Sequence, residues 1–102
     1  MVVKVTNDVF NNEVMKSEKP VLLDFYADWC GPCKMVGPIV EEIAKEHPEY
    51  FVGKVNVDEN PDLAGRFSIV SIPTLVVMKD GKVVSSAVGA RTKADLLAML
   101  NV

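Results

Sequence analysis

The sequence predicts an α/β fold in which helices cover a mixed β-sheet, and three patterns support this prediction. Strand-like apolar segments alternate along the chain with segments of helical periodicity. Residues 21–27 (VLLDFYA) are almost continuously apolar, which is typical of a central strand covered on both faces. Near the end of the chain, two strand-like segments flank Asp80-Gly81, a dipeptide that suits the positive φ angles of a tight hairpin.

In the first half of the chain, residues 2–5 are expected to form a short strand, and Thr6 or Asn7 to cap a helix. One side of that helix carries Val9, Phe10 and Val14. After the strand at 21–27, a second helix follows Cys30 and should end before Pro48. Its apolar stripe is formed by residues spaced three or four apart, namely Cys33, Val36, Val40, Ile43, Ala44 and His47.

In the second half, strands are expected at residues 51–57, 74–79 and 82–88. Asn60-Pro61 is a helix start with a capping residue and a proline in the first turn. Thr92, followed three residues later by Asp95, resembles a capping box and should begin the last helix. These two helices would pack through Leu63, Ala64 and Phe67 and through Leu96, Leu97 and Leu100.

Length and composition indicate one globular domain over residues 1–102. Of the 102 residues, 49% are hydrophobic and 25% are charged, which favours a packed core over disorder. The 11 lysines and arginines and 14 acidic residues give a net charge of -3, without a long run of either sign. We therefore expect no nucleic acid partner and no attraction to an anionic membrane.

The N-terminal residues MVVKVTNDVF lack the charged start, apolar stretch and cleavage site of a secretory signal. No apolar run is long enough to span a bilayer. The chain is therefore expected to be cytoplasmic, although a chain whose signal had been removed would look the same. In the cytoplasm a close cysteine pair is more often catalytic or metal-binding than structural.

Both cysteines lie in one motif, WCGPCK at residues 29–34, and three roles are open to them. A disulfide that closes about four residues would stabilise the fold by only roughly 1.9 kcal/mol. A closed zinc site needs four ligands, and besides the two cysteines the chain offers His47, at the far end of the predicted helix. Only a site shared between molecules would supply the missing ligands, so we expect no metal.

The third role is redox chemistry. If the helix begins near Pro32, Cys30 lies at its N-terminal end, where free backbone N–H groups favour a thiolate, the nucleophile of disulfide exchange. Cys33 instead lies on the apolar stripe and faces the core. Gly31 and Pro32 form the tight turn between them and put no bulk in front of the sulfur. Cys30 is therefore the expected nucleophile and Cys33 the expected resolving cysteine.

WCGPCK, preceded by VLLDFYA and followed downstream by SIPT and VGA, resembles the thioredoxin family over essentially the whole chain. The spacing of the CGPC motif to Asp24, Pro73 and Gly89 makes the resemblance specific. It implies the thioredoxin fold, with four helices, two on each face of a five-stranded mixed sheet in the order first, third, second, fourth, fifth strand. It also implies a monomeric protein disulfide reductase without a cofactor, which acts on disulfide-bearing proteins and is itself reduced by a thioredoxin reductase.

Two charged residues have both a functional and a simpler interpretation. Asp24 lies in an apolar strand, where burial should raise the pKa of its carboxyl and allow proton exchange near neutral pH. The resemblance makes Asp24 the proton acceptor and donor for Cys33; alternatively, local hydrogen bonds hold it near the strand end. Lys54 matches a lysine near that acid in the family, but by pattern alone it is an outward residue of an alternating strand.

The resemblance also implies a flat apolar surface on which protein substrates dock. It is formed by Trp29, Gly31, Pro32, Ile72, Pro73, Val88, Gly89 and Ala90. Pro73 would be cis, facing the cysteines and leaving the neighbouring backbone free to pair with a substrate strand. The sequence departs from the commonest family pattern at Tyr26, where many members carry tryptophan, and at Gly37, where alanine is usual.

Two other functions remain alternatives to a reductase. A thiol oxidase or isomerase on the same fold would carry a histidine between its cysteines, a charge that Gly31-Pro32 does not bring. A binding scaffold, in which redox activity is incidental, would not be expected to keep an intact CGPC motif. Replacing both cysteines by serine would separate the two, because a scaffold keeps its binding whereas an enzyme loses all turnover.

Overall fold

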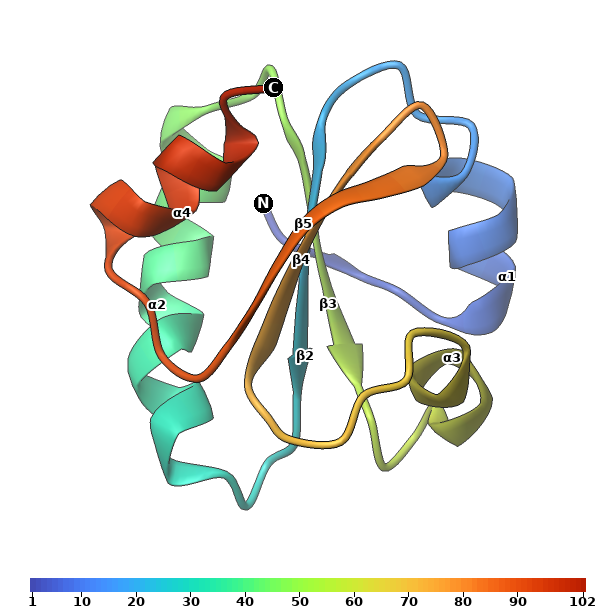
Figure 1. Cartoon of the computed structure of the whole chain (residues 1–102), viewed down its shortest axis with the longest axis vertical. Helices are drawn as coiled ribbons and strands as arrows, with labels where there is room; N and C mark the ends of the chain where they lie inside the picture. The colour runs from blue at the N-terminus through green and yellow to red at the C-terminus, as the bar shows by residue number, and fades with distance from the viewer.

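A computed structural model, which describes residues 1–102, has a five-stranded sheet in the order β1-β3-β2-β4-β5 (Figure 1). The strands are β1 (Val3–Lys4), β2 (Val21–Tyr26), β3 (Phe51–Asn56), β4 (Thr74–Lys79) and β5 (Lys82–Val88). The helices are α1 (Asn7–Val9), which continues as a π-helical turn (Phe10–Val14), α2 (Gly31–Glu46), α3 (Pro61–Arg66) and α4 (Lys93–Leu100). Strands β1, β3 and β2 are parallel, whereas β4 and β5 are antiparallel to their neighbours. The expected mixed sheet and strand order are confirmed.

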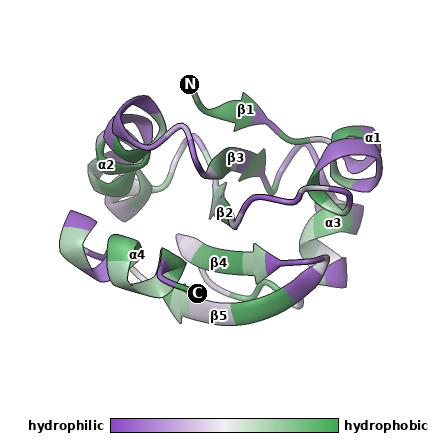
Figure 2. Ribbon diagram, turned by 90° about the horizontal axis from the view of Figure 1, so that it is seen from above, coloured by the Kyte–Doolittle hydropathy of each residue, from purple (hydrophilic) through white to green (hydrophobic).

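Helices cover both faces of the sheet, α2 and α4 on one and α1 and α3 on the other (Figure 2). Alternate residues of the central strand β2 point to opposite faces, so the sheet separates two apolar clusters. On the α1 and α3 face the cluster is Val5, Phe10, Val14, Val21, Leu23, Phe25, Val55, Leu63, Val76 and Met78. On the α2 and α4 face it is Leu22, Val36, Val40, Ile43, Ala44, Val52, Leu75, Val77, Leu96 and Leu100.

Two of the three predicted caps and the hairpin turn are present. Asn60 stands at the N-cap position of α3, but its side chain makes no capping hydrogen bond and instead donates to the carbonyl of Asn56 at 3.1 Å. The Thr6 side chain accepts a hydrogen bond from the backbone N–H of Val9, and that of Thr92 accepts one from the N–H of Asp95, so each satisfies a free donor of its helix. Asp80 and Gly81 both have positive φ, at 53° and 76°, as a two-residue hairpin turn requires.

Three further details differ from the expectation. The first strand is shorter than residues 2–5, because only Val3 and Lys4 have partners in the β3 register. The first helix widens to a π-turn, in which the N–H of Met15 donates to the carbonyl of Phe10. His47, expected on the apolar stripe of the second helix, has its Nδ1 2.9 Å from a carboxylate oxygen of Glu49, two residues along the chain.

The topology gathers four chain segments at one edge of the sheet. β2 runs toward this edge and ends there at Tyr26, beside Asn56 at the end of the parallel strand β3. Because β4 is antiparallel to β2, it begins at the same edge, where Thr74 pairs with Phe25 and with Val88 at the end of β5. The loop from β2 to α2, which carries the cysteines, therefore lies beside the loops that precede β4 and follow β5.

Candidate active site at the start of helix α2

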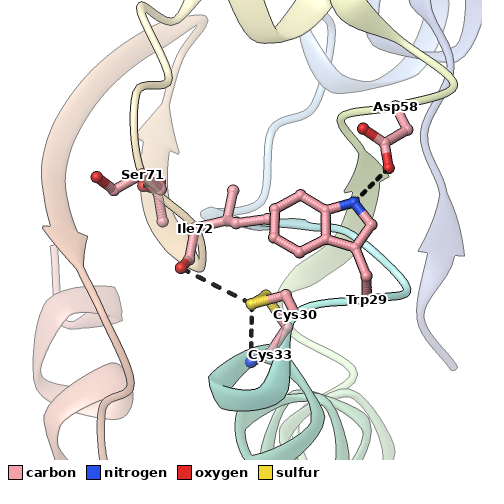
Figure 3. The surroundings of a disulfide bond; sticks show 7 residues. Trp29, Cys30, Cys33, Asp58, Ser71 and Ile72 are labelled. Atoms are coloured by element: carbon pink, nitrogen blue, oxygen red, sulfur yellow. Dashed lines mark hydrogen bonds between the residues drawn. A yellow bond between two sulfur atoms is a disulfide. The ribbon is translucent and has the colours of Figure 1, made fainter.

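The cysteine pair sits where strand β2 passes into helix α2. Cys30 is the N-cap of the helix, with an extended backbone at φ −85° and ψ 114°, and Gly31 and Pro32 form the first turn. Cys30 and Cys33 are joined as a disulfide, with their Cα atoms 5.3 Å apart (Figure 3). Both cysteines pack against Ala27. The expected helix start near Pro32 is therefore what brings the two sulfurs together.

The helix start distinguishes the two sulfurs electrostatically. The backbone N–H of Cys33 donates to Sγ of Cys30 at 3.3 Å, which is the hydrogen bond of a helix N-cap (Figure 3). This donor and the helix dipole favour negative charge on Cys30. Solvent exposure does not distinguish the two cysteines, because in the disulfide Cys30 is 4% and Cys33 5% exposed. The chemical asymmetry of the site thus comes from the cap and not from accessibility.

The loop that precedes β4 closes over the disulfide. Sγ of Cys30 lies 3.8 Å from the carbonyl oxygen of Ile72 (Figure 3). The Ile72-Pro73 peptide bond is cis, and Pro73 is buried. The N–H of Gly89 donates to the carbonyl of Pro73 at 2.7 Å, with Gly89 at a φ of 92° that favours glycine. Ile72 lies just outside β4 and makes no backbone hydrogen bond of its own.

Exposed apolar side chains surround this loop. Trp29 is 70% and Val88 57% exposed, and Gly31, Pro32 and Ala90 are also exposed. Ile72 and Gly89 are half-buried. Of the residues that the resemblance assigns to this surface, Pro73 alone is buried rather than open to solvent.

Two residues that the sequence analysis did not identify fix the position of Trp29. Its indole Nε1 donates to a carboxylate oxygen of Asp58 at 2.8 Å (Figure 3). The backbone N–H of Asp58 in turn donates to the side-chain oxygen of Asn56 at 2.9 Å. Asn56 is buried at the end of β3, where an asparagine commonly shapes the turn that follows. In the sequence, the polar segment NVDEN (residues 56–60), which begins at the last residue of β3, indicates such a turn.

Asp24 lies under the disulfide on the α2 face of the sheet. It is only 4% exposed, and Oδ1 has no hydrogen-bond partner in the protein. Burial raises the pKa of Asp24 to about 6, and the positive charge of Lys54 limits that rise. Lys54 is directly beside Asp24 in the parallel register of β2 and β3. The simpler interpretation was that local hydrogen bonds hold Asp24 near the strand end. Because Oδ1 has no hydrogen-bond partner, the structure gives that interpretation no support.

A pocket of about 130 Å3 connects these groups. It is lined by Val2, Asp24, Tyr26, Cys33, Gly37, Val40, Glu41 and Lys54. The pocket is large enough for water and has polar groups that can bind it. Glu41 was not expected here, and the two departures from the family pattern, Tyr26 and Gly37, form part of the wall. Lys54 is half-buried at this pocket rather than simply outward-facing.

No metal site accompanies the cysteines. Nowhere in the chain do three or more His, Cys, Asp or Glu side chains come together in a way that could hold a metal ion. His47 caps the opposite end of α2 from Cys30. None of the helices combines the length and the apolar character needed to cross a membrane.

The fold, the capping cysteine and its partner one turn along the helix define a dithiol-disulfide oxidoreductase. The family model described as Thioredoxin matches residues 1–102, and the chain belongs to the thioredoxin family. It is 53% identical over 100 residues to a thioredoxin of Mycobacterium tuberculosis, covering 97% of this chain and 86% of the relative. It is 51% identical over 98 residues to a thioredoxin of Acidithiobacillus ferridurans, covering 95% and 91% of the two chains.

A third relative has a compound name. The chain is 49% identical over 100 residues to a "Bifunctional thioredoxin reductase/thioredoxin" of Mycobacterium leprae, covering 97% of this chain and 22% of the relative. With family membership established, the activity follows: the protein is a protein disulfide reductase that works by dithiol-disulfide exchange through the Cys30-Gly31-Pro32-Cys33 motif. The resemblance seen in the sequence is confirmed.

Proposed function

We propose that the two cysteines and Asp24 divide the exchange reaction among them. The thiolate of Cys30 attacks one sulfur of a substrate disulfide, a new S–S bond forms, and the other substrate sulfur leaves as a thiolate. Cys33 then gives its proton to the carboxylate of Asp24 and attacks the sulfur of Cys30. The second substrate thiolate leaves, so two electrons have passed from the protein dithiol to the substrate.

The observation that carries this assignment is the capping hydrogen bond on Cys30. Because the N–H of Cys33 donates to Sγ of Cys30, the charged form of Cys30 is favoured over that of Cys33. Asp24 suits the role of base for Cys33, since both line one pocket and the pKa of Asp24 is raised by burial to about 6, close to neutral pH. Lys54 has a supporting role, because its charge acts on Asp24.

We propose further that substrates dock on the exposed apolar residues around the disulfide. The backbone of Ile72 pairs with no other backbone group, so its N–H is available to an extended substrate segment beside Cys30. Trp29 and Val88 supply exposed apolar area on either side. An unfolded or extended protein segment bearing a disulfide is the substrate class that fits this combination.

The electron donor is proposed to be a thioredoxin reductase in the cytoplasm. The relative from Mycobacterium leprae, whose name combines both proteins, suggests that the two activities work together. A disulfide reductase also needs a compartment in which thiols are kept reduced, and the cytoplasm is one. In a reconstituted assay, sustained substrate reduction should require the reductase; equal turnover with glutathione alone would contradict this partner.

Serine substitutions test the order of the cysteines. Cys33→Ser should trap a mixed disulfide between Cys30 and a disulfide-bonded peptide, because attack can occur and resolution cannot. Cys30→Ser is the matched control and should trap nothing. Intact mass spectrometry after incubation with the peptide measures both. A peptide adduct on Cys33 in Cys30→Ser, with none on Cys30 in Cys33→Ser, would reverse the assignment.

A further inference from the structure

Tyr26 shares one pocket with the buried carboxyl group. It lies two residues after Asp24 on β2, so both side chains leave the same face of the sheet. Both line the pocket of about 130 Å3 that also reaches Cys33. Tyr26 is half-buried, whereas the five residues before it in β2 are buried. Its ring therefore stands where the buried part of the strand meets solvent.

The ring of Tyr26 also lies beside a cation. Nζ of Lys54 is 5.9 Å from the ring centroid, within the range of a cation–π attraction. Lys54 takes part in none of the salt bridges of the structure, so no carboxylate fixes its ammonium group directly. The aromatic face is thus the group that can hold this long, flexible side chain in one place.

The titratable side chains that face Asp24 come from three elements. β3 supplies Lys54, its neighbour in the register, and α2 supplies Cys33 and the exposed Glu41. β2 supplies only the phenol of Tyr26, and β4 places the apolar Leu75 beside Asp24. Lys54 is therefore the one cation that lines the pocket, and a cation there favours the ionised form of Asp24.

We propose that Tyr26 is a positioning residue for the resolving step, whose ring holds the Lys54 ammonium at the pocket and so sets how readily Asp24 takes the proton of Cys33. This inference rests on the proposed role of Asp24. Without the ring, the lysine chain is free to extend into water, where its charge is screened and acts less on Asp24. The carboxylate that accepts the proton is then formed only at higher pH.

The titration of Asp24 tests the proposal. Tyr26→Leu should displace the Asp24 midpoint upward by about half a pH unit, a change of about threefold in the ionised fraction below the midpoint. Tyr26→Phe keeps an aromatic face and should retain the midpoint of the unchanged protein. The measurement is the chemical shift of the Asp24 carboxyl carbon against pH in the oxidised protein. An unchanged midpoint in Tyr26→Leu would overturn the proposal.

A double-mutant cycle separates positioning from loosened packing. Lys54→Met should displace the midpoint at least as far as Tyr26→Leu, and the two changes together no further than Lys54→Met alone. If Tyr26 mattered only for packing, Tyr26→Leu would displace the midpoint equally with and without Lys54. Fully additive displacements would therefore also overturn the proposal.

A separate experiment tests the proposed role of Asp24 as the base for Cys33. If Asp24 is not the base for Cys33, Asp24→Asn leaves the rate of mixed-disulfide resolution unchanged, as followed by release of the reduced peptide. The carboxyl titrations of the Tyr26 and Lys54 variants would still show whether the ring positions the lysine. If Asp24 is the base and Tyr26 positions Lys54, Tyr26→Leu slows resolution of the mixed disulfide about threefold at pH values below the Asp24 midpoint, and raising the pH restores the rate.

Discussion

At the scale of single residues, the site favours the charged form of the Cys30 thiol and the neutral form of the Asp24 carboxyl. Cys30 receives a backbone N–H at the start of a helix, which favours its charged form. Asp24 lies in an apolar layer with Oδ1 unpartnered, which favours its neutral form. A thiol that ionises easily and a carboxyl that ionises late are what a nucleophile and a base near neutral pH require.

The buried carboxyl makes stability depend on pH. The pKa of Asp24 is about 6 in the folded protein, and about 3.9 is expected in the unfolded chain. Between these values the unfolded chain releases its proton first, so the free energy of unfolding falls as pH rises, by about 3 kcal/mol in all. The loss begins near pH 4 and is nearly complete about one pH unit above the folded pKa of about 6.

Asp24→Asn should remove this dependence, because an amide of the same shape carries no charge. At pH 7 the variant should be more stable than the unchanged protein by up to about 3 kcal/mol, and at pH 4 the two should be nearly equal. Urea unfolding of the oxidised proteins across this range measures both. Lower stability of Asp24→Asn at pH 7 would show that the carboxylate is favourably bound in the fold.

At the scale of elements, the fit between neighbouring strands depends on Gly53 in β3. A Cβ added there would lie 2.6 Å from Cγ2 of Val5 and 3.2 Å from Cδ2 of Leu23. Both side chains are fully buried, and valine has little rotamer freedom to move aside. The absence of a side chain at Gly53 is thus what lets the segment after β1 pack against the sheet.

Gly53→Ala should therefore destabilise the fold by about 1 to 3 kcal/mol through overpacking. Gly65→Ala is a matched control, since a Cβ at Gly65 in helix α3 meets nothing within 4 Å. Thermal unfolding followed by circular dichroism compares the two. Equal or higher stability of Gly53→Ala would mean that the β1 segment moves aside without loss.

In helix α2, replacement of Gly37 by alanine should stabilise the fold, in contrast to Gly53. A Cβ there would also meet nothing within 4 Å, and glycine within a helix lowers stability relative to alanine. Gly37→Ala should raise the free energy of unfolding by up to about 1 kcal/mol. Denaturant unfolding at pH 4, where Asp24 is neutral in both proteins, measures this gain without a contribution from the pocket. A loss of stability would contradict the open space seen at this position.

At the scale of the whole molecule, the sequence predicts local features more directly than contacts between distant segments. The helix start at Cys30 and the buried Asp24 could be predicted because a cap and an apolar strand are local patterns. The order of the strands came only from the family resemblance, since periodicity does not say which strands pair. Asp58 was missed because its partner, Trp29, lies 29 residues away in sequence. The pocket was missed for the same reason, as its walls come from separate elements.

The topology makes these distant residues one site. β2 and β3 end, β4 begins and β5 ends at a single edge, which brings the disulfide, Ile72 and Gly89 together. The function of the molecule is therefore the transfer of electrons at that edge, and its direction depends on the potential of the cysteine pair.

The reduction potential of the Cys30-Cys33 pair is the most direct test of the reductase function. Equilibrating the protein across a graded dithiol-disulfide buffer and counting free thiols at each step gives this potential. We expect a reversible two-electron transition at a potential more reducing than the cytoplasmic glutathione pool, because electrons must flow from this protein to its substrates. A clearly more oxidising potential would contradict a reductase and favour an oxidase or isomerase, and the lack of any reversible transition would leave only a binding scaffold.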